Sequence, residues 1–247
     1  MLRDVALLVV LVAVLIGARA AALLTADLHH VITAAPGELL YTATFDDFLD
    51  DWALYEGRLS AQVEDAVLRL AVDTPQSSPF STTTPHFGDF DLRVKTHPIA
   101  GPLDNGYGVI FRLQDAQNYY WFMISSDGYY QVLRSVDGEQ KELSTWIDST
   151  LINQGLEAEN WLRVVGQGDQ FEFFINDEQV TLCIPDDPAG ESTFVADCVD
   201  GQMLDTLVDD SISTGQLGVV ARSFNDPGVE VKFDNVLVYG PAVSSES

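Results

Sequence analysis

The chain has 247 residues, of which 47% are hydrophobic and 20% charged, a composition typical of globular rather than disordered proteins. Twelve basic and 38 acidic residues give a formal net charge of −26, which repels phosphate backbones and excludes nucleic-acid binding. Two cysteines are too few for a disulfide-dense scaffold or for a zinc site built from cysteines.

The first 24 residues contain an apolar segment. Val5 to Ile16 is an unbroken run of 12 apolar residues. This run has the length of a signal-peptide core and is shorter than the roughly 20 residues that span a bilayer. Ala18-Arg19-Ala20 has the small-x-small pattern that signal peptidase cleaves, which indicates a signal peptide. The alternative is an uncleaved membrane helix that continues to Leu24, or even to Ile32, with Arg19 reaching the outer headgroups.

Both interpretations place the chain after about residue 35 outside the cytoplasm. We predict a signal peptide or, as the preferred alternative, an uncleaved membrane anchor at 1–32, followed by a tether at 33–41. The body would then lie extracytoplasmically, at the cell surface or in the periplasm. His29 and His30 would lie at the membrane interface, and their alternative role is to ligate a pigment or haem.

Alternation of apolar and polar residues with period two dominates the chain after the tether. Asp127-Gly128 and Asp137-Gly138 stand where hairpin turns belong. No segment there keeps a helical period over three turns. We therefore predict an all-β, two-sheet jelly-roll sandwich at 42–240, with a tail at 241–247. The predicted strands are Leu39–Phe45, Arg58–Val63, Val67–Val72, Phe90–Thr96, Tyr107–Leu113, Tyr119–Ser125, Tyr129–Arg134, Trp161–Val165, Gln170–Ile175, Gln216–Ala221 and Val229–Tyr239.

An Asp-rich segment at 184–213 interrupts the strand pattern and is predicted to be an insertion. Cys183 and Cys198 are the only cysteines, and an oxidising compartment would join them in a disulfide. The loop of about 16 residues that this bond closes is worth about 3 kcal/mol in the chain-entropy model. The insertion is interpreted as an ordered loop, and the alternative is contact with a partner or gating of a ligand.

Several motifs of the predicted sandwich resemble one known superfamily. They lie at Asp104–Arg112, Asp115–Phe122, Ser125–Tyr130, Leu162–Val165, Phe171–Asn176 and Phe233–Val238. The pattern is similar to the concanavalin A-like lectin/glucanase jelly rolls, and most similar to the laminin G-like and 3-keto-disaccharide-hydrolase-like domains of exported bacterial proteins. The resemblance covers about 42–240 apart from the insertion. It implies the fold but not one function, because this fold serves lectins, hydrolases and structural modules alike.

Strand alternation also predicts a binding surface. The first of the central strands would turn Tyr107, Val109, Phe111 and Leu113 to the core. Aligned strands would then share one outward surface carrying Arg112, Tyr119, Trp121, Tyr129 and Gln131. Aromatic rings stack on the C–H face of a pyranose, and planar polar groups take its hydroxyls. In the resembled superfamily saccharides lie on the concave sheet. The alternative is that these rings pack beneath a loop or beneath the insertion.

Calcium is the metal that the acidic residues suggest, because carboxylates and carbonyls are its ligands. Sandwiches of this kind hold calcium near the chain ends, where Asp46, Asp47 and Asp234 could meet. The alternative is that these aspartates cap turns. His86 and His97 are interpreted as structural.

Catalysis has little support in the sequence. Retaining glucanases of the resembled superfamily carry a Glu-x-Asp-x-x-Glu strand motif, and this chain has none. The close glutamate pairs, Glu139/Glu142 and Glu157/Glu159, are predicted to be solvated. The prediction is therefore a non-catalytic, membrane-anchored module that binds glycan or cell-envelope polysaccharide. One alternative is an accessory subunit of a membrane complex, with its helix in the bilayer and its sandwich on the outer face. The other is a sugar-active hydrolase.

Overall fold

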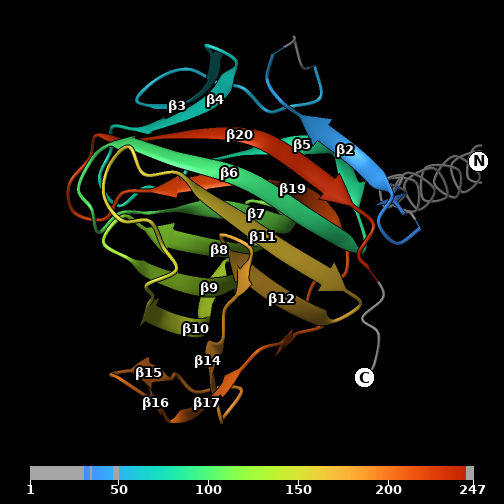
Figure 1. The fold of residues 1–247 in the computed structure, drawn as a ribbon, viewed down its shortest axis with the longest axis vertical. Coiled ribbons are helices and arrows are strands. Elements are labelled where there is room, and N and C mark those ends of the chain that lie inside the picture. Colours follow the sequence, from blue (N-terminus) through green and yellow to red (C-terminus); the bar gives the residue numbers. More distant parts are fainter. Residues whose placement is uncertain (1–30, 34, 47–49, 243–247) are drawn as a thin grey trace, which may run out of the picture. The chain divides into compact units, whose positions relative to one another are not determined.

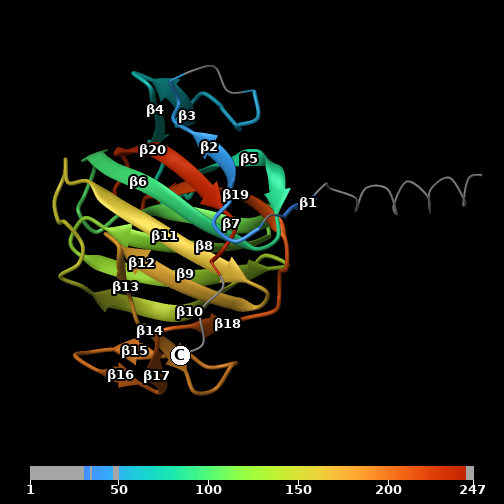
Figure 2. The ribbon, with the colours of Figure 1, turned by 45° about the vertical axis from the view of Figure 1, so that its right-hand side comes forward.

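A computed structural model describes residues 31–33, 35–46 and 50–242. The N-terminal apolar segment, including His29 and His30, lies outside the described residues. The described residues form strands, turns and bends without a helix, in agreement with the all-β prediction. Two large sheets face one another, as Figures 1 and 2 show from two directions. In the part of the chain that the structure describes, no helix is long and apolar enough to cross a membrane.

The first sheet, sheet A, has the strand order β1-β5-β19-β7-β8-β9-β10. Its short strand β1 pairs with β5 in parallel, and its other strands pair antiparallel. The strands are β1 (Val31–Ile32), β5 (Phe80–Phe87), β7 (Gly106–Asp115), β8 (Asn118–Ser125), β9 (Tyr129–Val136), β10 (Glu139–Asp148) and β19 (Gly215–Arg222).

The second sheet, sheet B, has the order β13-β12-β11-β6-β20-β4-β3, and β18 and β2 pair with β12 and β20. All of its pairs are antiparallel. The strands are β2 (Leu39–Ala43), β3 (Leu59–Glu64), β4 (Val67–Val72), β6 (Phe90–Ala100), β11 (Asn160–Gln167), β12 (Gln170–Ile175), β13 (Glu178–Gln179), β18 (Leu207–Val208) and β20 (Val229–Tyr239).

Each of the 11 predicted strands corresponds to a strand of the structure, but two long strands were not predicted. Strand β5 contains Ser81, Thr82 and Thr83, polar residues that are buried and therefore break the alternation. Strand β10 begins with exposed and half-buried polar residues, so its apolar signal is weak. Two boundaries also change. The tether predicted at 33–41 overlaps β2, which begins at Leu39. Val31–Ile32 form β1, so an N-terminal helix that continues to Ile32 is wrong for these two residues.

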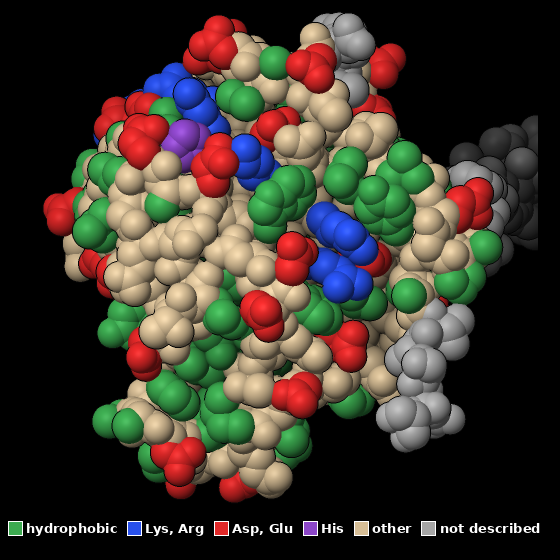
Figure 3. Space-filling model, in the orientation of Figure 1, with side chains coloured by type: hydrophobic (Ala, Val, Ile, Leu, Met, Phe, Trp, Pro, Cys, Tyr) green, Lys and Arg blue, Asp and Glu red, His purple; other side chains and the backbone are tan. Residues whose placement is uncertain are grey.

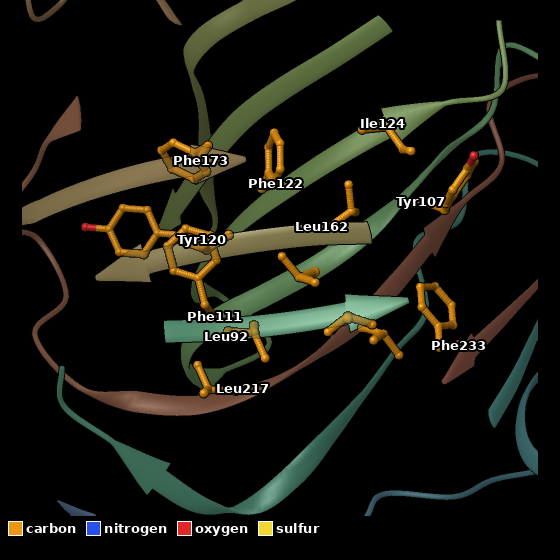
Figure 4. Packing of buried hydrophobic residues seen from close by; sticks show 14 of the residues in the cluster. Leu92, Tyr107, Phe111, Tyr120, Phe122, Ile124, Leu162, Phe173, Leu217 and Phe233 are labelled. Carbon is orange, nitrogen blue, oxygen red and sulfur yellow. The ribbon is translucent and has the colours of Figure 1, made fainter. Parts of the chain in front are cut away.

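The core fills the space between the two sheets (Figure 4). Phe111 and Tyr120 of sheet A stack with ring centroids 5.3 Å apart, and Phe122 packs on Phe173 of sheet B at 5.0 Å. Such contacts bury large aromatic surfaces, which supply most of the hydrophobic stabilisation of a sandwich.

A bulge in β7 corrects one predicted face. Arg112 has a φ of 50°, and the pairing of β7 with β8 shifts register after Phe111. The bulge reverses the alternation of side chains. Leu113 therefore lies in an apolar cluster on the outer face of sheet A rather than in the core. Arg112 turns to the opposite side, where its guanidinium lies 4.5 Å from the ring of Phe171, a core residue.

The predicted insertion contains short strands beside β10 (Figures 1 and 2). A disulfide joins Cys183 and Cys198, which confirms the predicted bond. The segment returns to the sandwich at β18, which pairs with β12. The carboxylate of the next residue, Asp209, accepts hydrogen bonds from Tyr120 and Arg134. The short strands are β14 (Leu182–Pro185), β15 (Thr193–Phe194), β16 (Cys198–Val199) and β17 (Gly201–Leu204).

The outer face of sheet B carries basic side chains among acidic ones, and Figure 3 shows the mixture on the face over which β6, β11 and β12 run. Arg93 and Arg163 each bind the buried carboxylate of Asp91 through two hydrogen bonds. Burial acts to raise the pKa of Asp91, but the hydrogen bonds from both arginines outweigh it and hold the pKa below its usual value. Arg163 makes this ion pair across strands from β11, whereas Arg93 makes it within β6.

Candidate functional site

The outer face of sheet A, on the side away from the core, carries a second apolar cluster. An outward face of a sandwich is normally polar, so buried apolar and aromatic side chains there mark a surface with a further role. The cluster contains Ile110, Leu113, Tyr119, Trp121, Met123, Leu133 and Val220, with Phe80 and Trp146 packed against it.

The sequence of β7 makes room for large rings on this face. A Cβ added at Gly106 would lie 3.0 Å from Met123 Cε and 3.6 Å from Trp146 Cη2. Gly106 therefore allows the indole of Trp146, which starts from the edge strand β10, to extend over the sheet. Pairing of β9 with β10 shifts register between Ser144 and Ile147, and this irregularity directs Trp146 outward.

The structure brings together four of the five predicted site residues and separates the fifth. Trp121 is opposite Leu133 in the β8–β9 register, and Gln131 is opposite Met123, so both lie on the outer face with the second cluster. Tyr119 packs on Trp121 with ring centroids 5.3 Å apart. Tyr129 follows the same alternation as Gln131 and is 41% exposed.

Arg112 is the residue that the structure places elsewhere. Its guanidinium is 1% exposed, and it donates to the carbonyl oxygens of Ile212 at 2.9 Å and Gly168 at 2.6 Å. Burial lowers its pKa from the ordinary value. The expectation that Arg112 shares the aromatic surface is wrong, because the bulge turns its side chain to the end of the core. There it binds the turn at Gly168 and the irregular segment at Ile212.

Burial limits which aromatic rings on the outer face of sheet A can stack on a sugar. Trp121 is only 1% exposed, so its ring is not open for stacking by a sugar. The guanidinium of Arg222 lies over it, with Cζ 5.5 Å from the ring centroid. Tyr129 is exposed on this face, and the rings of Phe80, Trp146 and Phe224 are half-buried. Tyr129, Trp146 and Phe224 lie together.

Those three rings line a hollow of about 230 Å³, here called the aromatic hollow. Trp146 and Phe224 meet edge to face with centroids 6.4 Å apart. The remaining lining residues are polar, and they are Asp104, Ser125 and Asp127. The hollow thus combines ring faces with carboxylates that can accept hydrogen bonds from hydroxyl groups.

A larger hollow of about 840 Å³, here called the polar hollow, lies over strands β9 and β10. Leu133 and Arg222 connect it to the outer face of sheet A, and the turn at 189–191 of the insertion forms part of its wall. Its acidic lining residues are Asp137, Glu139, Glu142 and Glu191, and its other basic ones are Arg134 and Lys141.

Three buried polar groups on this face lack partners within the described residues. They are the indole N–H of Trp121 and both the amide nitrogen and the amide oxygen of Gln131, which is 1% exposed. Buried polar atoms without a partner are rare in folded proteins, and each suggests an unseen water or ligand.

Sequence reasoning missed three residues of the site, namely Trp146, Arg222 and Phe224. Trp146 lies in the strand that was not predicted, and the strand predicted at Gln216–Ala221 ended one residue before Arg222. Extending that strand by one residue would have placed Arg222 beside the expected outward residues.

The calcium prediction is not tested as a whole. Asp47 lies outside the described residues, and Asp234 accepts two hydrogen bonds of 2.7 Å from the neighbouring Asn235. Asp46 is exposed. Among the residues that the structure describes, no group of three or more His, Cys, Asp or Glu side chains is arranged to hold a metal ion.

The glutamate pairs that were considered for hydrolysis are exposed, as predicted. Glu157 pairs with His97 at 2.9 Å and Glu159 with Lys95 at 2.7 Å. On the outer face, the alternation of β8 presents Tyr119, Trp121 and Met123, which carry no carboxylate.

Comparison with known proteins identifies the fold. No protein-family model and no curated protein sequence matches the chain. Among solved structures, the carbohydrate-binding module CBM66 from Bacillus subtilis has a TM-score of 0.51 and 14% identity, over 75% of this chain and 93% of that one. A Bacillus subtilis protein of unknown function with a galectin-like fold has a TM-score of 0.56 and 12% identity, covering 83% and 97%.

The β-glucanase of Bacillus licheniformis is similar too, with a TM-score of 0.51 and 11% identity over 83% of this chain and 99% of the enzyme. These proteins share a jelly-roll fold but differ in what their names describe, so the likeness concerns the fold alone. The resemblance expected from the sequence is confirmed at that level: this chain has the fold of the concanavalin A-like lectins and glucanases.

Proposed function

We propose that this protein is an extracytoplasmic glycan-binding module and that the outer face of sheet A is its binding surface. The observation that carries the proposal is the aromatic hollow, in which accessible rings of Tyr129, Trp146 and Phe224 stand beside the carboxylates of Asp104 and Asp127. A pyranose stacks its C–H face on such a ring and donates its hydroxyls to the carboxylates.

The unpartnered polar atoms of Trp121 and Gln131 lie beneath this surface, because both residues are only 1% exposed, and the proposal does not rest on their contact with a sugar. The similarity to CBM66, a carbohydrate-binding module by name, is consistent with this surface.

The proposed location rests on two further observations. A disulfide persists in oxidising compartments outside the cytoplasm, and Cys183–Cys198 is such a bond. The apolar run at 5–16 is the basis for proposing export and membrane anchoring.

The experiment compares single aromatic replacements on the two outer faces. Trp146→Ala removes a wall of the aromatic hollow, and Trp161→Ala is the matched control on the outer face of sheet B. Binding to a panel of soluble polysaccharides is measured by affinity electrophoresis and then by calorimetry for those that bind. Trp146→Ala is expected to weaken binding at least tenfold, or about 1.4 kcal/mol, and Trp161→Ala is expected to leave it unchanged.

Circular dichroism must show both variants folded. Tyr129→Ala, which changes a 41% exposed ring, provides a second and less disruptive test of the hollow. Retention of full affinity by both Trp146→Ala and Tyr129→Ala would refute the assignment of the surface.

A second candidate function, that of an accessory subunit of a membrane complex, is favoured by a feature of the insertion. Val195 is 72% exposed and Val199 48%, both on the β15–β16 hairpin. Exposed apolar side chains on a projecting segment are typical of a contact with another protein. Deletion of 186–205 is expected to release the protein from such a complex while leaving glycan binding intact.

A further inference from the structure

Arg222 is an arginine without a close carboxylate in a strongly acidic protein. Every other arginine among the described residues has a carboxylate within 4.0 Å, whereas Arg222 has neither such a carboxylate nor a hydrogen bond there. The charge of Glu142, which lines the same polar hollow, acts on Arg222 from farther away. A guanidinium offers five N–H donors in a rigid plane, so a group left without acceptors on a half-buried surface is unusual.

The surroundings hold this guanidinium in place. Its Cζ lies 4.7 Å from the ring centroid of Phe224 and 5.5 Å from that of Trp121. Cation–π contacts of this kind fix the position of the charged plane without using its N–H donors. Burial lowers the pKa of Arg222 from its ordinary value, but an arginine stays protonated at neutral pH.

Arg222 lies where the two hollows approach one another. It lines the polar hollow, and its neighbour Phe224 lines the aromatic hollow. The unpartnered indole N–H belongs to Trp121, which the guanidinium covers, and the unpartnered amide of Gln131 lies on the next strand. A saccharide that occupies the aromatic hollow and extends over Phe224 therefore meets Arg222.

We infer, on the basis of the proposed function, that Arg222 recognises a carboxylated sugar residue within the bound glycan. A carboxylate matches the planar fork of an arginine and accepts two parallel hydrogen bonds from it. The neutral hydroxyls of the glycan would then lie in the aromatic hollow, beside Asp104 and Asp127.

The charge of the protein limits how many acidic groups the ligand carries. The net charge is −26, and four acidic side chains line the polar hollow, so a polysaccharide charged at every residue is repelled. The inferred ligand is a neutral backbone with isolated uronic acid groups.

The test uses one polysaccharide in two forms. Glucuronoxylan and the same sample after chemical reduction of its carboxyl groups differ only in charge at the uronic acid. Calorimetry with the wild-type full-length protein is expected to show at least tenfold tighter binding of the acidic form. Arg222→Gln is expected to abolish this preference, so that the variant binds the acidic and the reduced form with equal affinity. Arg58→Gln, at a side chain 72% exposed and paired with Asp73, is the charge-matched control and should keep the preference.

The outcomes separate the two claims. Equal affinity of the wild type for both forms overturns the role of Arg222 and leaves glycan binding standing. Failure to bind either form of this or any other polysaccharide overturns the proposed function itself. The comparison of the two ligands with the wild type does not depend on the folding of a variant. Arg222→Lys keeps the positive charge but loses the planar guanidinium, so it should retain only part of the preference for the acidic form.

Discussion

Tyr120 connects the core to the insertion, and its replacement by Phe tests this connection. The ring stacks on Phe111, and the hydroxyl donates to the carboxylate of Asp209 while it accepts from the buried N–H of Ile212 at 3.2 Å. Tyr120→Phe keeps the ring and removes only the oxygen. It therefore creates little cavity, and its effect reports the hydrogen bonds.

The expected loss of stability follows from these two bonds. A hydrogen bond to a charged carboxylate is worth about 1.5–3 kcal/mol, and a buried backbone N–H left without a partner costs at least about 1 kcal/mol. Asp209 keeps its contact with Arg134, which offsets part of the loss. We expect Tyr120→Phe to lower the free energy of unfolding by about 3 kcal/mol.

The stability cost of Tyr120→Phe is expected to depend on pH, because the hydroxyl of Tyr120 binds an ionised carboxylate. Burial acts to raise the pKa of Asp209, but hydrogen bonds from Tyr120 and Ser211 outweigh it, and the pKa lies below its usual value. A carboxyl with a lowered pKa stabilises the fold fully above its ordinary pKa of about 3.9, and this stabilisation is lost as the pH falls towards the lower value. Because Tyr120→Phe raises the folded-state pKa of Asp209, its cost is expected to be largest above about pH 5 and to shrink below about pH 4.

The measurement is urea unfolding followed by tryptophan fluorescence at several pH values, with Tyr239→Phe as the control. Tyr239 stacks on Arg93 and its hydroxyl makes no hydrogen bond within the described residues. Hydrogen exchange should also show faster exchange at 209–214 in Tyr120→Phe. A difference of less than about 0.5 kcal/mol between the two variants, within the range of ordinary surface changes, would refute the argument.

Three further changes test other parts of the fold. The double replacement Cys183→Ser/Cys198→Ser should cost about 3 kcal/mol in urea unfolding, and an equal stability of oxidised and reduced wild type would contradict this. Gly108→Ala would drive its Cβ into the backbone oxygen of Phe122, so we expect at least about 3 kcal/mol of destabilisation or failure to fold, and a normal melting temperature would be the contrary result. Asp91→Asn should cost about 2 kcal/mol at pH 7 because it removes the charge shared by two arginines. The lowered pKa of Asp91 makes this cost fall as the pH drops below about 4, and a cost that is constant with pH would count against it.

Local sequence determined the strands whose alternation is clean. Val67–Val72 and Gln170–Ile175 alternate between buried and more exposed residues, and both were predicted with their observed bounds. Here one face of each strand packs on the core and the other meets solvent, so burial directly imposes the period of two. The disulfide could also be predicted, since the chain has only one pair of cysteines.

Only the tertiary structure decided the composition of the site. The bulge at Arg112 depends on pairing with β8 and β19, and a single residue in a left-handed conformation moved Arg112 and Leu113 to opposite faces. Trp146 reaches the site from an edge strand over a glycine of β7, a contact between residues 40 positions apart in the sequence. Periodicity reports which face of a strand is buried, but it does not report which distant side chain covers that face. The sequence alone therefore determined a two-sheet fold with one aromatic surface, whereas long-range packing determined which rings are buried and which remain free to bind a ligand.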